Sequence, residues 1–345
     1  MTGQPLAVVG TGLVTGVGLY APAACAAIRC AIDGFQETRF RDAGGDWIIG
    51  CEVPLEQPWR GTTKLVKMLA MAVQECAATV PQLELEAVPI LLCFAEADRP
   101  GRLDQLTDQV AHQVSTELGI RFHEKSLVIE YGRVGTVVAL RQARRLIYEA
   151  RIPRVLVAGV DSLLIGSTLQ ACEKRDLLLT SQNSDGFIPG EAASALLLQA
   201  PRPAGAPQLI CRGLGFGVEP ATEDSEKPLR ADGLVKAIQD ALTDAGCELG
   251  DLDFRITDIS GSQYRFKEAS LALSRTLRKR KEEFDLWHPA DCIGEVGAAI
   301  GGVMIAVIDA ACRKGYSKGH RILFHLGNDD GKRTAMVFGF SGTGT

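Results

Sequence analysis

Apolar runs and amphipathic patterns alternate along the chain, and the same succession occurs twice. In the first part, apolar runs predict strands at residues 6–13, 88–94, 154–160 and 192–198, and helical periodicity predicts helices at 62–77 and 135–150. Beyond the Pro- and Gly-rich segment 201–207, the same signals predict strands at 208–216, 254–259, 321–326 and 334–340 and helices at 232–245 and 294–313. This recurrence of six elements predicts two similar halves, residues 1–200 and 201–345.

The predicted strands are continuous apolar runs rather than alternations of apolar and polar residues. Such runs indicate largely parallel sheets that helices cover on both faces. We therefore expect a layered α/β protein. The sequence has no repeat with a period of about 20 to 50 residues, so a solenoid or a propeller is excluded.

Composition adds limits on partners and location. The chain has 345 residues, of which 46% are hydrophobic and 23% charged, as in a globular protein with a large core. Its formal net charge of −5 gives no general reason to expect nucleic acid as a partner. The ten cysteines lack metal-binding spacing and indicate reduced thiols. Without a basic leader or an apolar segment of about 20 residues, we expect a cytoplasmic protein that does not enter membranes.

The segment GTGLVTGVG near the start is similar to a dinucleotide-binding turn. Gly10 and Gly12 follow a predicted strand, but Thr15 stands at the third glycine position and the glycine comes one place later, at Gly16. The same glycines also suit the tight exit of a first strand. The sequence has no P-loop, HExxH, GxSxG or EF-hand pattern, so we expect no metal and no cofactor.

Three longer segments resemble the β-ketoacyl synthases of the thiolase superfamily. They are VLVAGVDSLL at 155–164 with DGFIPGEAASALLL at 185–198, GEVGAAIGGVMIAVIDA at 294–310, and YGRVGTVVALRQARRLI at 131–147. The resemblance extends over nearly the whole chain. It implies a duplicated thiolase-like fold with layers in the order αβαβα and mainly parallel mixed sheets.

The resemblance also identifies the positions at which these enzymes hold their catalytic residues. Arg133 stands at the nucleophilic cysteine, Ser260 at the first histidine and Asp291 at the second. Leu286 stands at the position of the lysine that these enzymes usually have five residues before the second histidine. Condensation needs a thiolate to accept the acyl group and two imidazoles to stabilise developing charge. Arginine stays protonated and cannot attack a thioester. We therefore expect a pseudoenzyme that does not condense acyl groups.

The replaced residues suggest a specific arrangement in the old site. The cysteine and second histidine of a condensing enzyme face each other across the cavity, so we hypothesise an ion pair between Arg133 and Asp291. In the alternative, Arg133 turns to solvent or binds an anion, and Asp291 caps the turn before the helix predicted at 294–313.

Other residues could carry altered chemistry or bind a partner. Cys292 and His288 are candidates for a relocated nucleophile and acid or base, although a buried cysteine beside an incidental histidine also explains them. A basic cluster follows the helix predicted to begin near Lys267. It is either a solvated helix end or a dock for an acidic partner such as an acyl carrier protein. This basic cluster consists of Arg275, Arg278, Lys279, Arg280 and Lys281.

We therefore expect a non-catalytic binding partner, scaffold or adaptor. One role is a homo- or heterodimer partner in an acyl-chain pathway, as chain length factors are to their active partners. The other is an accessory protein of bacterial effector secretion that binds a secreted effector. The alternative is an acyltransferase or hydrolase that uses Cys292 or Ser260 on acyl-thioesters. We expect dimerisation through strand 154–160, which is predicted to be an apolar edge that needs a cover.

Overall fold

A single mixed sheet runs through the molecule. The computed structural model describes residues 3–202 and 207–342, so most of the segment predicted as a linker lies outside the described residues. From one edge to the other, the strands follow the order β10 (Leu286–Trp287), β9 (Phe254–Thr257), β11 (Arg321–Gly327), β12 (Lys332–Ser341), β8 (Gln208–Val218), β1 (Leu6–Thr15), β7 (Glu191–Gln199), β6 (Arg154–Ser162), β4 (Ile90–Phe94) and β5 (Leu127–Glu130).

The strand order is the same on both sides of the junction between β1 and β8. We number the strands of this sheet along the chain within each half, which leaves out the separate hairpin of β2 and β3. From the outer edge to the centre, both halves then have the order third, second, fourth, fifth, first. The outer strands pair in parallel and the inner strands pair antiparallel, and β1 joins β8 antiparallel at the centre. The sheet is therefore mixed, as expected for the thiolase-like fold.

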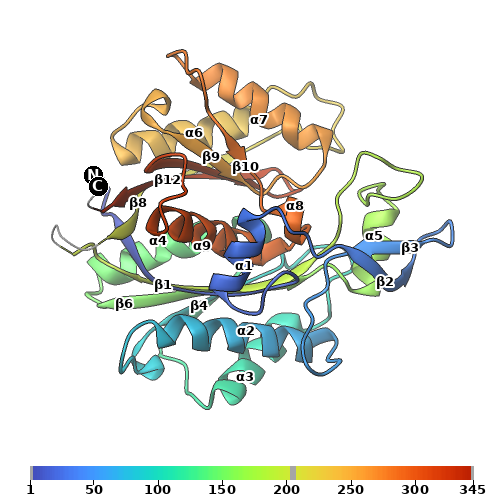
Figure 1. Cartoon of the computed structure of the whole chain (residues 1–345), viewed down its shortest axis with the longest axis horizontal. Coiled ribbons are helices and arrows are strands. Elements are labelled where there is room, and N and C mark those ends of the chain that lie inside the picture. Colours follow the sequence, from blue (N-terminus) through green and yellow to red (C-terminus); the bar gives the residue numbers. More distant parts are fainter. Residues whose placement is uncertain (1–2, 203–206, 343–345) are drawn as a thin grey trace.

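Helices lie in three layers that alternate with the two parts of the sheet (Figure 1). The central layer holds α4 (Gly135–Tyr148) and α9 (Ile300–Arg313), with α1 (Ala21–Arg29) packed beside α9. The outer layers are α2 (Gly61–Ala78) with α3 (Leu106–Leu118) and α6 (Asp232–Ala245) with α7 (Gln263–Thr276). The layers follow the predicted order αβαβα. Within the described ranges, we find no helix that is long and apolar enough to cross a membrane.

Glycines on the first strand of each half allow a helix to pack directly on the backbone. A Cβ added to Gly12 on β1 would lie 2.0 Å from the carbonyl oxygen of Ala72 on α2. A Cβ added to Gly215 on β8 would lie 1.9 Å from that of Ala237 on α6. The glycines near the start of the chain therefore serve helix packing, and nothing in their surroundings supports the dinucleotide interpretation.

The central helix α9 is buried on almost every side. Gly301 and Gly302 face Thr136 of α4 and Ser194 of β7, where an added Cβ would approach side-chain atoms to 2.6 and 2.2 Å. These small residues bring the helix close to its neighbours, as the Gly- and Ala-rich segment predicts. The helix was predicted from residue 294, but it begins at Ile300, after the short helix α8 (Ala290–Ile293) and a 3-10 turn at Gly297–Ala299.

The edges of the sheet differ from the prediction. Strand β6 lies between β4 and β7 and is hydrogen-bonded on both sides, so the prediction that residues 154–160 form an edge is wrong. The edge on this side is β5, which pairs with β4 alone. Its side chains Leu127 and Val128 are 44% and 40% exposed.

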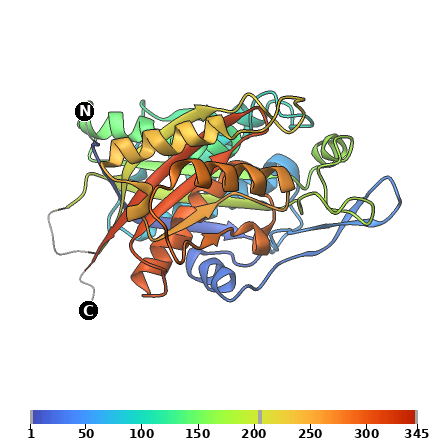
Figure 2. The ribbon, with the colours of Figure 1, turned by 90° about the horizontal axis from the view of Figure 1, so that it is seen from above.

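Two smaller elements lie away from the layers. The hairpin of β2 (Gln36–Arg41) and β3 (Trp47–Gly50) projects from the body at the end opposite the termini (Figure 2). Helix α5 (Gly166–Glu173) lies near the base of this hairpin and reaches the mouth of the cavity described below.

Candidate functional site

Arg133 lies in a tight turn between β5 and α4. The turn is a single 3-10 turn, Gly132–Val134, and Gly132 has φ of 51°, a value that glycine adopts without strain. Asn328, from the loop between β11 and β12, holds this turn. Its Nδ2 donates to the carbonyl oxygen of Tyr131 at 2.9 Å, and its Oδ1 accepts from the N–H of Val134 at 3.2 Å. Both halves of the fold thus fix the position of Arg133.

The guanidinium of Arg133 is surrounded by carboxylates. Its Nη1 lies 3.1 Å from Oε2 of Glu295, its Nη2 pairs with Oδ1 of Asp329, and its Nε lies 3.8 Å from Oδ2 of Asp258. Burial alone would lower the pKa of Arg133, but these carboxylates raise it well above the usual value. A permanently charged arginine therefore occupies the turn after β5. We call Arg133 with these three carboxylates the Arg133 cluster.

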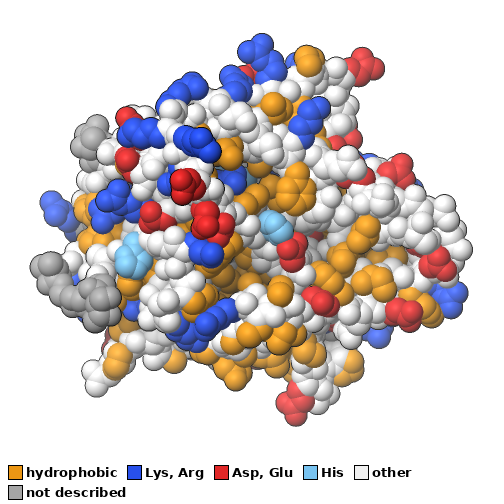
Figure 3. Space-filling view, turned by 45° about the horizontal axis from the view of Figure 1, so that its top comes forward, with side chains coloured by type: hydrophobic (Ala, Val, Ile, Leu, Met, Phe, Trp, Pro, Cys, Tyr) orange, Lys and Arg blue, Asp and Glu red, His pale blue; other side chains and the backbone are white. Residues whose placement is uncertain are grey.

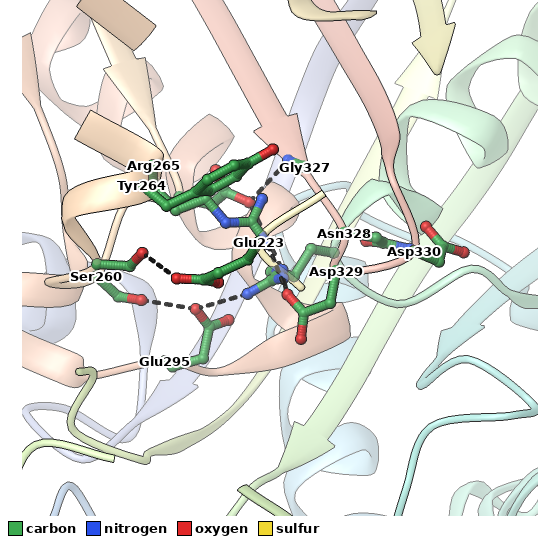
Figure 4. A network of polar contacts seen from close by, with 12 residues as sticks. Glu223, Ser260, Tyr264, Arg265, Glu295, Gly327, Asn328, Asp329 and Asp330 are labelled. Atoms are coloured by element: carbon green, nitrogen blue, oxygen red, sulfur yellow. Dashed lines mark hydrogen bonds and ion pairs between the residues drawn. The ribbon is translucent and has the colours of Figure 1, made fainter. Parts of the chain in front are cut away.

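Ser260 joins the same cluster from the loop after β9. Its Oγ donates to Oε2 of Glu295 at 2.8 Å, the oxygen that also accepts from Arg133 (Figure 4). The N–H of Gly297 donates to the other oxygen of Glu295 at 3.3 Å. The Glu295 oxygen that accepts from Ser260 is shared with the guanidinium of Arg133, so the hydroxyl of Ser260 belongs to the same ion-pair network.

Asp329 links the Arg133 cluster to two further arginines. Arg265 of α7 lies 2.6 Å from its Oδ1, and Arg175 lies 3.9 Å from its Oδ2. Burial raises the pKa of Asp329, but Arg133 and Arg265 outweigh this effect and hold the pKa below the usual value. Figure 4 shows Asp329 and Arg265 beside Glu295 and Ser260. The site is therefore a network of shared ion pairs rather than one isolated pair.

A cavity of about 280 Å³ opens beside this network. Its apolar wall includes Leu163, Leu177 and Phe187. Its charged wall, among the described residues, comprises Glu96, Asp98, Arg99, Arg133, Arg175, Asp224, Glu295, Asp329 and Asp330. Carboxylates therefore outnumber arginines by six to three in this lining.

Cys172 of α5 supplies a thiol to the lining of this cavity. Burial and the neighbouring Asp329 raise its pKa to about 11. At neutral pH such a thiol is protonated, whereas a nucleophilic cysteine needs a lowered pKa. The cavity therefore contains no activated thiolate among the residues that the structure describes.

Asp291 lies outside this site. Its carboxylate pairs with Nδ1 of His288 at 2.7 Å, and its side chain is 67% exposed. The predicted ion pair between Arg133 and Asp291 is therefore wrong. The carboxylate that faces Arg133 is Glu295, four residues later, because α8 turns the chain before it enters the cavity.

Cys292 and His288 line a second pocket, of about 430 Å³, between the end of α1, the segment of β10 and α8, and the second half of α9. Burial raises the pKa of Cys292 to about 11, with Asp291 adding to the effect. The carboxylate of Asp291, close to Nδ1 of His288, raises the pKa of the histidine despite its burial. These residues share a pocket, but they do not reach the Arg133 cluster, and the thiol is not activated.

The basic cluster predicted as a partner dock lies at the end of α7 and in the following loop. The upper part of the face in Figure 3, which carries α6 and α7, displays many lysine and arginine side chains. The five residues fall into two groups: Arg275, Lys279 and Lys281 hold partners within the chain, and Arg278 and Arg280 are exposed. The cluster therefore offers fewer unpaired charges than its sequence suggests.

Sequence reasoning did not identify Glu295, Asp329, Asp258 or Glu96. Glu295 stands within the quoted segment GEVGAAIGG, and Asp329 stands in the turn GNDDGK between the last two strands. A charged residue within a run of small, apolar residues was the available signal for Glu295. Asp329 resembles an ordinary turn residue, because its role depends on the approach of β11 to the turn that holds Arg133.

Comparisons with known proteins confirm the fold. No protein-family profile and no curated protein sequence matches this chain. Among solved structures, a type II polyketide synthase acyl-carrier protein in complex with its ketosynthase superposes with a TM-score of 0.80 at 15% identity, covering 98% of this chain and 99% of that chain. The ishigamide ketosynthase/chain length factor superposes with a TM-score of 0.78 at 16% identity, covering 98% of this chain and 99% of that chain. An oxazolomycin ketosynthase domain of Streptomyces albus gives 0.78 at 14%, with 98% and 75% covered.

These likenesses extend over nearly the whole chain, but the sequence identity is low. The chain therefore has the thiolase-like fold of ketosynthases and chain length factors. Fold alone does not establish activity.

Proposed function

We propose that this chain is a non-catalytic protein with a ketosynthase fold that acts as a binding partner or scaffold. The Arg133 cluster carries the proposal. A guanidinium held by three carboxylates lies in the turn where the resemblance to β-ketoacyl synthases implies a nucleophile. The thiols of Cys172 and Cys292 are protonated at neutral pH, so neither replaces the missing thiolate.

Comparison with solved structures supports a protein partner. The similar structures include a ketosynthase in complex with an acyl-carrier protein and a ketosynthase with its chain length factor from Xenorhabdus doucetiae. In this proposal, the chain pairs with a second copy or with a related active subunit. All ten cysteines are free thiols, which supports a reducing compartment such as the cytoplasm.

We propose β5 as the strand through which the dimer forms. It is an unpaired edge with exposed Leu127 and Val128, and an apolar edge of this kind is a template for pairing with another chain. Light scattering should find a dimer, and Val128→Lys should convert it to a monomer. Val218→Lys, at an exposed valine on β8, is the matched control and should remain dimeric. A wild-type monomer at micromolar concentration would contradict this part of the proposal.

Intact-protein mass spectrometry tests whether chemistry remains. The purified chain is incubated with hexanoyl- and malonyl-thioesters and weighed, with a catalytically active ketosynthase as a positive control. We expect no acyl adduct on the chain. A stoichiometric adduct that maps to Cys172, Cys292 or Ser260 would favour the alternative, an acyltransferase or hydrolase with altered residues.

A further inference from the structure

Glu96 is a half-buried carboxylate of the cavity beside the Arg133 cluster, and no other described side chain pairs with it. Among the described residues, no other residue donates a hydrogen bond to the side chain of Glu96 or forms an ion pair with it; its own N–H is its hydrogen-bond donor, and the charges of Arg133 and Arg99 reach it at longer range. It lies directly under the turn, since a Cβ added to Gly132 would be 2.2 Å from its carboxyl carbon. Burial raises the pKa of Glu96. A partly buried carboxylate in this position is incompletely solvated and has no donor from another residue.

The arginines around the cavity already have carboxylate partners. Nη1 of Arg99 lies 2.6 Å from Asp161, and Nη2 of Arg175 lies 2.6 Å from Asp224. The guanidinium of Arg133 is shared among three carboxylates. Arg265 and Lys332, from outside the lining, pair with Asp329 and Asp330. Glu96 and Asp98 are the lining carboxylates that no described side chain pairs with, so the uncompensated charge is negative. This balance favours a cation over an anion as the occupant.

The opposite wall is apolar and limits the shape of the occupant. Leu163, Leu177, Phe187 and Ala171 line it, and the cavity volume of about 280 Å³ suits a small organic molecule. A bare metal ion would leave this wall unused. A short alkyl chain with a charged end would contact both walls.

We propose that the cavity binds a small organic cation, an alkylamine or alkylguanidine, whose charged end contacts Glu96 and whose carbon chain lies against Leu163, Leu177 and Phe187. The inference rests on the proposed non-catalytic function, in which the former catalytic cavity is kept for binding. It names the class of ligand for that cavity. The Nε of Arg99 lacks an acceptor, so an anionic ligand is the competing outcome that the test must separate.

Isothermal titration calorimetry with agmatine at pH 8 and low ionic strength tests this proposal, with hexylamine as a second cation and hexanoate as the anion. Wild-type protein should bind agmatine at one site per chain and should bind hexanoate more weakly. Glu96→Gln should weaken agmatine binding by about tenfold or more, because a charge-assisted hydrogen bond is lost. Glu56→Gln, at an exposed glutamate, is the matched control and should bind as wild type does.

A second variant keeps the test decisive if Glu96→Gln fails to fold. Ala171→Phe fills the cavity from α5 without changing any charge and should abolish agmatine binding. Gln170→Phe, at the exposed neighbouring position on the same helix, should not. The proposal is overturned if wild type does not bind agmatine saturably, if hexanoate binds more tightly, or if Ala171→Phe binds agmatine normally. The calorimetry measures equilibrium binding, and the intact-mass experiment measures acylation. Absence of agmatine binding would therefore reject the ligand proposal alone, and an acyl adduct would reject the non-catalytic function alone.

Discussion

Two arginines bind carboxylates in this region of the fold, in contrasting ways. Arg333 of β12 has a side chain that is 2% exposed, and its Nε lies 2.8 and 3.0 Å from the two oxygens of Glu268, which is equally buried. Arg133 has a side chain that is 13% exposed and shares its charge among three carboxylates beside a cavity. The first is a closed pair within the core, and the second faces a space that a ligand can enter.

The contrast separates a structural ion pair from a site. A fully buried pair is costly to break because the remaining partner is left as an uncompensated charge. In a shared cluster at a cavity, solvent and the other charges compensate part of the loss. We therefore expect stability to depend more on Arg333, and binding to depend more on the surroundings of Arg133.

The largest expected effect comes from Arg333→Met. This change leaves Glu268 buried without its partner, and we expect a loss of about 3 to 5 kcal/mol in the free energy of unfolding. Arg133→Met should cost less, because Arg265 still pairs with Asp329 at 2.6 Å. Urea unfolding measures both variants, with Arg280→Met at the exposed basic cluster as a control that should stay within about 0.5 kcal/mol of wild type. Equal losses for Arg333→Met and Arg133→Met would remove the distinction between the two arginines.

The sequence predicted most of the layers but not the site geometry. Helix α6 has the predicted bounds, and strands β1, β7 and β8 differ from prediction only at their ends. The continuous apolar runs of these strands are buried in the core, which is why the sequence pattern locates them well. Strand β2 was missed because its sequence, QETRFR, carries no apolar run, and β5 was missed because its apolar run, LVI, is only three residues long. Their pairing depends on tertiary neighbours rather than on local pattern.

The site was predicted in kind but with the wrong partner. The proposed replacement of a nucleophile by Arg133 implied a carboxylate nearby, and a carboxylate is present. The resemblance to β-ketoacyl synthases favoured Asp291, but α8 and the positive φ of Gly294 redirect the chain, so that Glu295 enters the cavity and Asp291 faces solvent. A change of direction over four residues cannot be read from residue types alone.

A double-mutant cycle distinguishes the two carboxylates. Arg133→Met combined with Glu295→Gln should show a coupling energy of about 0.5 to 3 kcal/mol, because the two side chains lie 3.1 Å apart. Arg133→Met combined with Asp291→Asn should be additive within about 0.5 kcal/mol. Thermal or urea unfolding of the three single variants, the two double variants and wild type supplies the values. Coupling to Asp291 that exceeded coupling to Glu295 would contradict the structure of the cluster.

Asp329, a partner of Arg133, and Glu268, the partner of Arg333, should contribute differently to the pH dependence of stability. The pKa of Asp329 lies below its usual value, so its ionised form stabilises the fold above pH of about 4, and this contribution is lost as pH falls. Asp329→Asn should therefore weaken stability at neutral pH and flatten its decline in acid. The effect should be modest, because this side chain is 43% exposed and solvent screens it.

Burial raises the pKa of Glu268 although Arg333 opposes the shift. Its contribution has the opposite sign, since it is fully present below the unfolded pKa of about 4.3 and is lost as pH rises through the folded value. Glu268→Gln should therefore reduce the dependence of stability on pH in that upper window. Urea unfolding from pH 3 to pH 8 compares both variants with wild type, and identical pH profiles for the two would contradict this assignment.

The smallest expected effect concerns the pair formed by His288 and Asp291, which lies outside the cavity. Asp291 raises the pKa of His288, so the pair stabilises the fold below pH of about 6.5 and loses this effect as pH rises through the raised pKa. Asp291→Asn should lower the pKa of His288, as followed by NMR titration of its ring. If His288 has the same pKa in wild type and in the Asp291→Asn variant, Asp291 does not act on this histidine.

The central claim is that the Arg133 cluster has replaced condensing chemistry. Release of carbon dioxide from malonyl-thioesters, in the presence and absence of an acyl-thioester primer, tests this claim most directly. Wild type and Arg133→Cys should both stay at the background rate, since Ser260 and Asp291, at the positions where the resemblance implies histidines, cannot supply the imidazoles that stabilise developing negative charge. A catalytically active ketosynthase in the same buffer confirms that the assay detects turnover. Decarboxylation by the wild-type chain above background, with a condensed product, would contradict the account.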